Sequence, residues 1–131
     1  MQKLPLKSYR ELIAWQRGMS LVDDAHRLSR MLAGRHSHLA SQLTRAALSV
    51  PANIAEGYGR AARGEYLHFL SIAVGSLREV ETLALVAQRQ FPDAEEAAHR
   101  LLAIADEVGR VLYGLRKSLT PETKKAPRWP G

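Results

Sequence analysis

Cysteine is absent from the 131 residues of this chain, and this absence excludes disulfide scaffolds, thiol catalysis and cysteine-based zinc sites. Long apolar runs are absent as well. No segment reaches the about 18 uncharged apolar residues of a membrane-spanning helix, and residues 1–10 lack the apolar core of a signal peptide. We therefore expect a cytoplasmic protein whose single domain folds without a metal ion or a disulfide.

The alternation of apolar and polar residues that marks half-buried strands is also absent, and apolar residues instead recur at steps of three and four along four segments. This period predicts four helices and almost no strand. The first helix is expected to start at a capping box formed by Ser8 and Glu11, and to end near Ala33, before Gly34. Its apolar stripe consists of Leu12, Trp15, Met19, Val22, Ala25, Leu28 and Leu32.

The second predicted helix follows a short connection over residues 34–38, in which Ser37 is the expected N-cap. Pro51 interrupts the pattern, because proline removes a backbone hydrogen bond inside a helix. The apolar stripe keeps its phase across Pro51, so we expect one kinked, continuous helix. This stripe consists of Leu39, Leu43, Ala46, Val50, Ile54 and then Gly57 or Tyr58.

The third predicted helix starts near residues 64–65 and stops before Pro92. Asp93 and Glu96 repeat the capping-box spacing, which predicts a fourth helix that ends at Thr120. The third stripe consists of Tyr66, Phe69 or Leu70, Ala73, Leu77, Val80, Ala84 and Ala87. The fourth stripe consists of Ala94, Ala97, Leu101, Ile104, Val108, Leu112, Leu115 and Leu119.

Short connections make successive helices antiparallel neighbours. The sequence therefore predicts an all-α protein, an antiparallel up-down-up-down four-helix bundle over residues 1–120. The tail over residues 121–131 has no helical period and is rich in proline and basic residues, so we expect it to be disordered.

Basic residues outnumber acidic ones, with nineteen Lys and Arg against thirteen Asp and Glu, a net charge of +6 and a pI near 10.1. The excess lies in residues 1–64 and in the tail. Such a balance is typical of proteins that bind nucleic acid or an anionic surface. Solvated helix faces that keep the protein soluble explain the same excess equally well.

Residue patterns that would carry chemistry are missing. The paired carboxylates Glu79 and Glu81, or Glu95 and Glu96, diverge on a helix, and no serine sits in a Gly-x-Ser-x-Gly turn. The five histidines lack the spacing of metal ligands. They are His26, His36, His38, His68 and His99. We therefore expect no enzyme, no metal and no cofactor.

A polar seam runs beside the apolar stripe of the second helix and is matched by a second seam on the third helix. Gly75 lies in mid-helix, where glycine costs about 1 kcal/mol against alanine, so we expect another backbone to approach it closely. The seam serves either buried hydrogen bonds between helices or a subunit or ligand contact. Its candidate residues are Gln42, Ser49, Asn53, Glu56, Gly57, Gly75, Ser76 and Glu79.

Four motifs in this order resemble bacterial four helix bundle proteins encoded in ribosomal-RNA intervening sequences. They are LIAWQ (12–16), SQLTRAALSVPANIAEG (41–57), EYLHFL (65–70) and GSLREVET (75–82). The resemblance runs from about Tyr9 to Leu119, and the family includes the accessory variability protein of diversity-generating retroelements. It implies a cytoplasmic bundle that assembles into a homopentamer. In the retroelement relatives, it further implies binding of nucleic acid and of a reverse transcriptase through a basic surface.

Our leading hypothesis is an oligomeric, non-enzymatic protein that binds RNA or DNA with little sequence specificity, because no aromatic platform for bases is evident. Arg45 is open to a second interpretation, as an internal ion-pair partner of Glu56 or Glu79. The alternatives to nucleic-acid binding are a scaffold that docks a partner protein such as a reverse transcriptase, and a small-molecule-binding or enzymatic bundle. The candidate phosphate contacts are Arg35, Arg45, Arg60, Arg63, Arg78, Lys124, Lys125 and Arg128.

Overall fold

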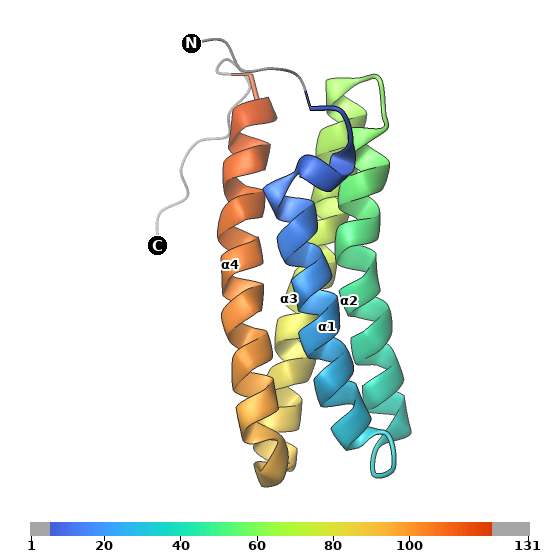
Figure 1. The fold of residues 1–131 in the computed structure, drawn as a ribbon, viewed down its shortest axis with the longest axis vertical. Coiled ribbons are helices and arrows are strands. Elements are labelled where there is room, and N and C mark those ends of the chain that lie inside the picture. Colours follow the sequence, from blue (N-terminus) through green and yellow to red (C-terminus); the bar gives the residue numbers. More distant parts are fainter. Residues whose placement is uncertain (1–5, 122–131) are drawn as a thin grey trace.

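The computed structural model describes residues 6–121, and four long helices make up most of it. They run alternately down and up the bundle, joined by short connections, and each packs on two neighbours (Figure 1). The predicted all-α, up-down-up-down bundle is confirmed, and residues 6–121 contain no strand. The helices are α1 (Ile13–Leu32), α2 (Ser37–Tyr58), α3 (Arg63–Gln90) and α4 (Glu95–Leu119).

The core is built from the predicted stripes of α2, α3 and α4. Every aliphatic position predicted for α2 is buried, and the α3 stripe is buried from Leu70 to Ala87. Half of the fourth predicted stripe is buried, and the other half lies at the margin of the core. The buried positions are Ala94, Leu101, Val108 and Leu112, and the half-buried ones are Ala97, Ile104, Leu115 and Leu119. Ala98 and Ala105 are buried without having been predicted. Apolar residues at helical spacing therefore marked the inner faces of these three helices correctly.

The stripe predicted for α1 is correct only in its second half, where Ala25, Leu28 and Leu32 are buried. In the first half Met19 is 41% exposed, whereas Leu21, which the prediction left out, is fully buried. Helix α2 approaches closely at Gly18, where a Cβ would lie 3.2 Å from Cβ of Pro51, closer than an ordinary van der Waals contact. The predicted positions thus marked the inner face of α1 from Ala25 onward but not before it.

Pro51 lies inside α2, and the helix is continuous through it, as the phase of the stripe predicted. The residue is buried against α1 rather than exposed at a break. Proline has no N–H to donate, so the backbone hydrogen bond to Ala47 is missing at this point of α2.

The helix starts differ from the predicted capping boxes. Ser8 caps a short 3₁₀ turn, Tyr9–Glu11, by accepting from the Arg10 N–H at 3.1 Å, and α1 begins only after it. His36, not Ser37, caps α2, because its Nδ1 accepts from the Leu39 N–H at 3.1 Å.

The predicted cap at the start of α4 is also wrong. A second 3₁₀ turn, Pro92–Ala94, precedes α4, and Ala94 occupies the N-cap position without a side-chain hydrogen bond. The Asp93 carboxylate is held by Arg35 instead, across the end of the bundle.

The tail over residues 122–131 lies outside the described residues, and with it the predicted contacts Lys124, Lys125 and Arg128. Within the described part of the chain, no helix is long and apolar enough to cross a membrane.

Candidate functional site

One hydrogen bond joins the two polar seams between α2 and α3, and two more lie within the α2 seam. Ser76 Oγ donates to Ser49 Oγ at 2.8 Å, and Asn53 Nδ2 donates to the Ser49 carbonyl at 2.7 Å and to its hydroxyl at 2.9 Å. All three side chains are half-buried. These contacts fit the first interpretation of the seam, a set of polar contacts inside one subunit.

The rest of the seam behaves differently. Gly75 is exposed, and an added Cβ would meet nothing within 4 Å, so no backbone of the described chain makes the expected close approach at this residue. The side chains of Gln42 and Glu79 make no hydrogen bond within residues 6–121. Gly75 and Glu79 lie on the outer side of α3, where no neighbouring helix covers them.

Gly57 is the seam glycine that another helix approaches. A Cβ there would lie 3.0 Å from Phe69 Cβ and 3.0 Å from a ring carbon of Tyr66. Tyr66 packs edge-on against Tyr58, with ring centroids 6.2 Å apart, and burial raises the pKa of the Tyr66 hydroxyl. This end of the α2–α3 pair is closely packed because Gly57 has no side chain.

Arg35 joins the two connections at one end of the bundle. Its guanidinium donates to both Asp93 carboxylate oxygens, at 2.8 and 3.0 Å, and to the Met31 carbonyl at 3.2 Å. It also lies over the Phe91 ring, 4.9 Å from the centroid. The hydrogen bond from Arg35 lowers the pKa of Asp93 below its ordinary value. We call these two residues the Arg35–Asp93 clasp.

Two more of the predicted phosphate contacts are engaged with carboxylates. Arg60 donates to Glu56 at 2.6 Å and lies 4.8 Å from the centre of the Phe69 ring. Arg78 donates to Glu81 at 2.8 Å. A phosphate that approaches either arginine must compete with the carboxylate already there.

Arg45 and Arg63 are exposed, and neither has a carboxylate within 4.0 Å in the part of the chain that the structure describes. The interpretation of Arg45 as a partner of Glu56 or Glu79 is wrong. Glu56 lies eleven residues further along α2, about 16 Å at 1.5 Å per residue, and it pairs with Arg60 instead. Arg30 on α1 is likewise exposed and without an ion pair among residues 6–121.

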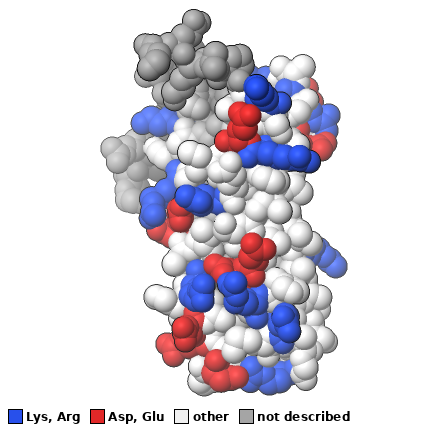
Figure 2. Space-filling model, in the orientation of Figure 1, with Lys and Arg blue, Asp and Glu red and all other residues white. Residues whose placement is uncertain are grey.

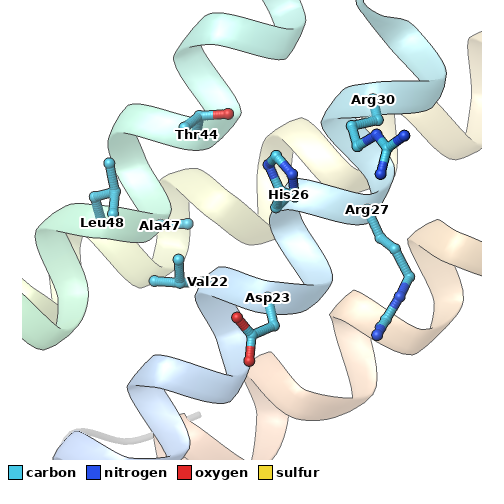
Figure 3. Close-up of a pocket in the computed structure, with 8 residues that line it drawn as sticks. All are labelled: Val22, Asp23, His26, Arg27, Arg30, Thr44, Ala47 and Leu48. Carbon is cyan, nitrogen blue, oxygen red and sulfur yellow. The ribbon is translucent and has the colours of Figure 1, made fainter.

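A shallow depression of about 500 Å³ lies between α1 and α2. Helix α1 contributes five of its lining residues and α2 contributes the opposite wall (Figure 3). Arg27 extends away from α2 and pairs with Asp24 at 2.5 Å. The lining residues are Val22, Asp23, His26, Arg27, Arg30, Thr44, Ala47 and Leu48.

The sequence did not single out the cations of this depression. His26 and Arg30 lie four residues apart, one turn along the same face of α1. Thr44, on the opposite wall, directly precedes Arg45. The i,i+4 spacing could have linked His26 with Arg30, but only the packing of α1 on α2 places them beside Thr44.

Charges of both signs are interspersed on the face shown in Figure 2. Fifteen of the nineteen basic residues and twelve of the thirteen acidic residues lie in residues 6–121, which leaves +3 for the described bundle. The other half of the net charge belongs to residues outside that range. The described surface is therefore only moderately basic, and the pairing of each arginine matters more than the total.

No group of three or more His, Asp or Glu side chains that could hold a metal ion occurs in the described part of the chain. Neither the depression between α1 and α2 nor the polar seam brings a pair of carboxylates together. The arrangement offers cations, hydroxyl groups and half-exposed apolar side chains, which suit binding.

Known proteins resemble this chain in sequence and in fold. The sequence matches the family model described as 23S rRNA-intervening sequence protein over residues 10–114. A comparison with curated proteins gives no match. A solved structure from Bacteroides thetaiotaomicron, titled as a protein with unknown function from the S23 ribosomal protein family, is similar with a TM-score of 0.74 and 19% identity. The similarity covers 80% of this chain and 99% of that one, and at this identity it shows the fold alone. Since the family model spans most of its length, the chain belongs to the 23S rRNA-intervening sequence protein family.

Proposed function

We propose that this protein is a non-enzymatic, oligomeric, cytoplasmic protein that binds RNA or DNA through the phosphate backbone, with little sequence specificity. The observation that carries the proposal is a set of arginines, unpaired within the described part of the chain, on α1, on α2 and at the start of α3. Helix α2 has one acidic residue in its 22 residues, Glu56, and Arg60 holds it. Arg30, Arg45 and Arg63 have no carboxylate within 4.0 Å among residues 6–121, so their guanidinium groups are available to phosphates.

Phosphate contacts of this kind act mainly through counterion release. Each neutralised phosphate frees condensed cations, so affinity falls steeply as salt rises. Arginines already paired with carboxylates contribute less, because the carboxylate must be displaced first. We therefore place Arg45, Arg63 and Arg30 ahead of Arg35, Arg60 and Arg78 as phosphate contacts.

Oligomerisation, as a pentamer, is proposed from the family resemblance. Exposed apolar side chains on the α1–α2 side support a contact between copies, since Met19 is 41% exposed and Leu48 is 51% exposed. Light scattering at micromolar concentration should give the mass of an oligomer. A monomeric mass would refute this part of the proposal.

A second candidate function is a scaffold that docks a partner protein, such as a reverse transcriptase, without touching nucleic acid. The same exposed apolar residues, together with the interspersed charges, favour it. In that case the positive charge would only steer the encounter with the partner.

Binding titrations separate the two functions. Single-stranded and double-stranded RNA and DNA are titrated with the protein at about 50 mM and about 200 mM salt. Nucleic-acid binding predicts association at the lower salt and a large loss at the higher salt. Absence of association with all four probes at the lower salt would sink the nucleic-acid proposal and leave the scaffold.

A further inference from the structure

One aromatic residue of the described chain is exposed, and it is Tyr113 on α4. Its exposed fraction is 67%, the highest of any large apolar side chain in residues 6–121. The other six aromatic residues there are half-buried, and each packs on another ring or on an arginine. They are Tyr9, Trp15, Tyr58, Tyr66, Phe69 and Phe91.

Tyr113 lines a groove of about 410 Å³ between α3 and α4. Arg78 and Arg110 lie in the same groove, and each is held by a carboxylate on its own helix, Glu81 and Asp106 respectively. Both arginine side chains are mostly exposed, at 62% and 69%.

Little side-chain bulk surrounds the ring. Gly109, one turn before Tyr113 on α4, lines the groove, and Gly114 has nothing within 4 Å of the position its Cβ would take. Because 67% of the Tyr113 side chain is exposed, a flat group can approach the ring.

Cations follow Tyr113 along the same face of α4. Arg116 and Lys117 stand three and four residues after it, so both lie one turn away. Arg116 donates to Ser71 Oγ at 3.4 Å, and neither cation has a carboxylate within 4.0 Å in the described chain. The groove and the next turn of α4 together hold four cations, Arg78, Arg110, Arg116 and Lys117, against the two groove acids Glu81 and Asp106.

We propose that Tyr113 is a stacking platform for one base of a single-stranded nucleic acid, with the neighbouring phosphates on Arg116 and Lys117. An exposed ring offers a face on which any base can stack, and nearby cations suit the backbone on either side of that base. A duplex keeps its base faces covered, so the site selects single strands. The expectation from the sequence that no aromatic platform exists is replaced by this site. The inference rests on the proposed nucleic-acid binding and adds to it a site and a strand preference.

The test compares three variants with the wild type. Tyr113→Ala removes the ring, Tyr113→Phe keeps it, and Ile13→Ala removes an apolar side chain of similar exposure, 58%, from α1. Affinities are measured for a single-stranded RNA of about 12 nucleotides and for a duplex of the same sequence, at about 50 mM salt. Because these side chains are exposed, we expect all variants to fold, which helical circular dichroism checks.

Tyr113→Ala should weaken single-strand binding by about 5-fold to 100-fold, the range of one lost base stack, and change duplex binding by less than about 2-fold. Tyr113→Phe and Ile13→Ala should bind like the wild type. Ultraviolet cross-linking of the wild type to the same RNA, read by mass spectrometry, should identify the peptide that contains Tyr113.

Two contrary results have different meanings. If the wild type binds RNA but Tyr113→Ala binds the single strand equally well and no cross-link forms at Tyr113, the platform is refuted while the proposed function stands. The groove would then be a surface for a protein partner, to which tyrosine and arginine are also suited. If the wild type binds no nucleic acid, the proposed function and the platform fall together.

Discussion

The two outer grooves of the bundle carry similar numbers of cations but differ in how those cations are held. In the α1–α2 depression Arg30 has no carboxylate partner among residues 6–121, and no aromatic residue lines the walls. In the α3–α4 groove Arg78 and Arg110 are both paired, and Tyr113 lines the same groove. The first groove is suited to phosphates, and the second to a base. Counting basic residues therefore says less about binding than asking which of them already have a partner.

Removing Arg45 and Arg63, which have no ion pair in the described part of the chain, should produce the largest loss of RNA affinity. The double variant Arg45→Ala/Arg63→Ala should lose on the order of 10-fold to 100-fold in RNA affinity at about 0.1 M salt, because two phosphate contacts disappear. Fluorescence anisotropy with a labelled RNA measures this loss.

The matched control for that variant is Arg89→Ala/Arg100→Ala, which removes the same charge from the last turn of α3 and from α4. Both residues are exposed and have no ion pair in the described part of the chain. Equal losses in the two double variants would show that only net charge matters, and the contrast between the two sides would disappear.

The packing of α2 on α3 holds the α1–α2 pair against the α3–α4 pair. A substitution at Gly57 tests this packing. Gly57→Ala should lower the free energy of unfolding by about 1–3 kcal/mol, because its Cβ would lie 3.0 Å from Phe69 Cβ. Chemical denaturation gives the value. Unchanged stability would mean that the two helices can separate slightly without cost.

Gly75→Ala is the opposite case on the outer side of α3. Here an added methyl group meets nothing within 4 Å, and alanine is the better helix former, so stability should rise by up to about 1 kcal/mol. The same denaturation experiment measures it. A loss of stability would indicate that another copy of the chain covers this position.

The Arg35–Asp93 clasp joins the α1–α2 connection to the α3–α4 connection. Its effect on stability depends on pH. Arg35 lowers the pKa of Asp93 below the ordinary 3.8, so the clasp stabilises the fold above that pH and loses its effect as pH falls through the lower, folded-state pKa. The difference in thermal stability between the wild type and Asp93→Asn should be small at pH 7 and should vanish at strongly acidic pH. A difference that persists there would assign the effect to packing on Phe91 instead of charge.

The sequence was a good guide to the fold wherever large apolar residues mark the inner face. The stripes of α2 and α3 could be read directly, because their buried positions are Leu, Ile, Val and Ala at helical spacing. Only the first half of α1 misled, because Gly18 faces Pro51 and a glycine contributes nothing to a hydrophobic pattern. The start of α4 misled because Asp93 is held by a residue 58 positions away.

The candidate site was harder to predict, because it depends on contacts between residues that are far apart in the sequence. Basic residues can be counted in a sequence, but their partners depend on tertiary structure, as with Arg35 and Asp93. Arg60 could have been recognised as engaged, since Glu56 stands four residues before it. Tyr113 lies between Leu112 and Leu115 and off the predicted stripe, so the sequence indicated that it is exposed. Only the packing of α3 on α4 shows the groove that it lines.

Nuclear magnetic resonance of the arginine side chains tests the central claim most directly. The claim is that arginines without a carboxylate partner contact the phosphates. On titration with single-stranded RNA at low salt, the Nε–H signals of Arg30, Arg45 and Arg63 should shift strongly, while the signal of Arg35 in its clasp stays nearly unchanged. A result in which Arg35 shifts as much as Arg45, or in which none of these signals moves, would contradict the account.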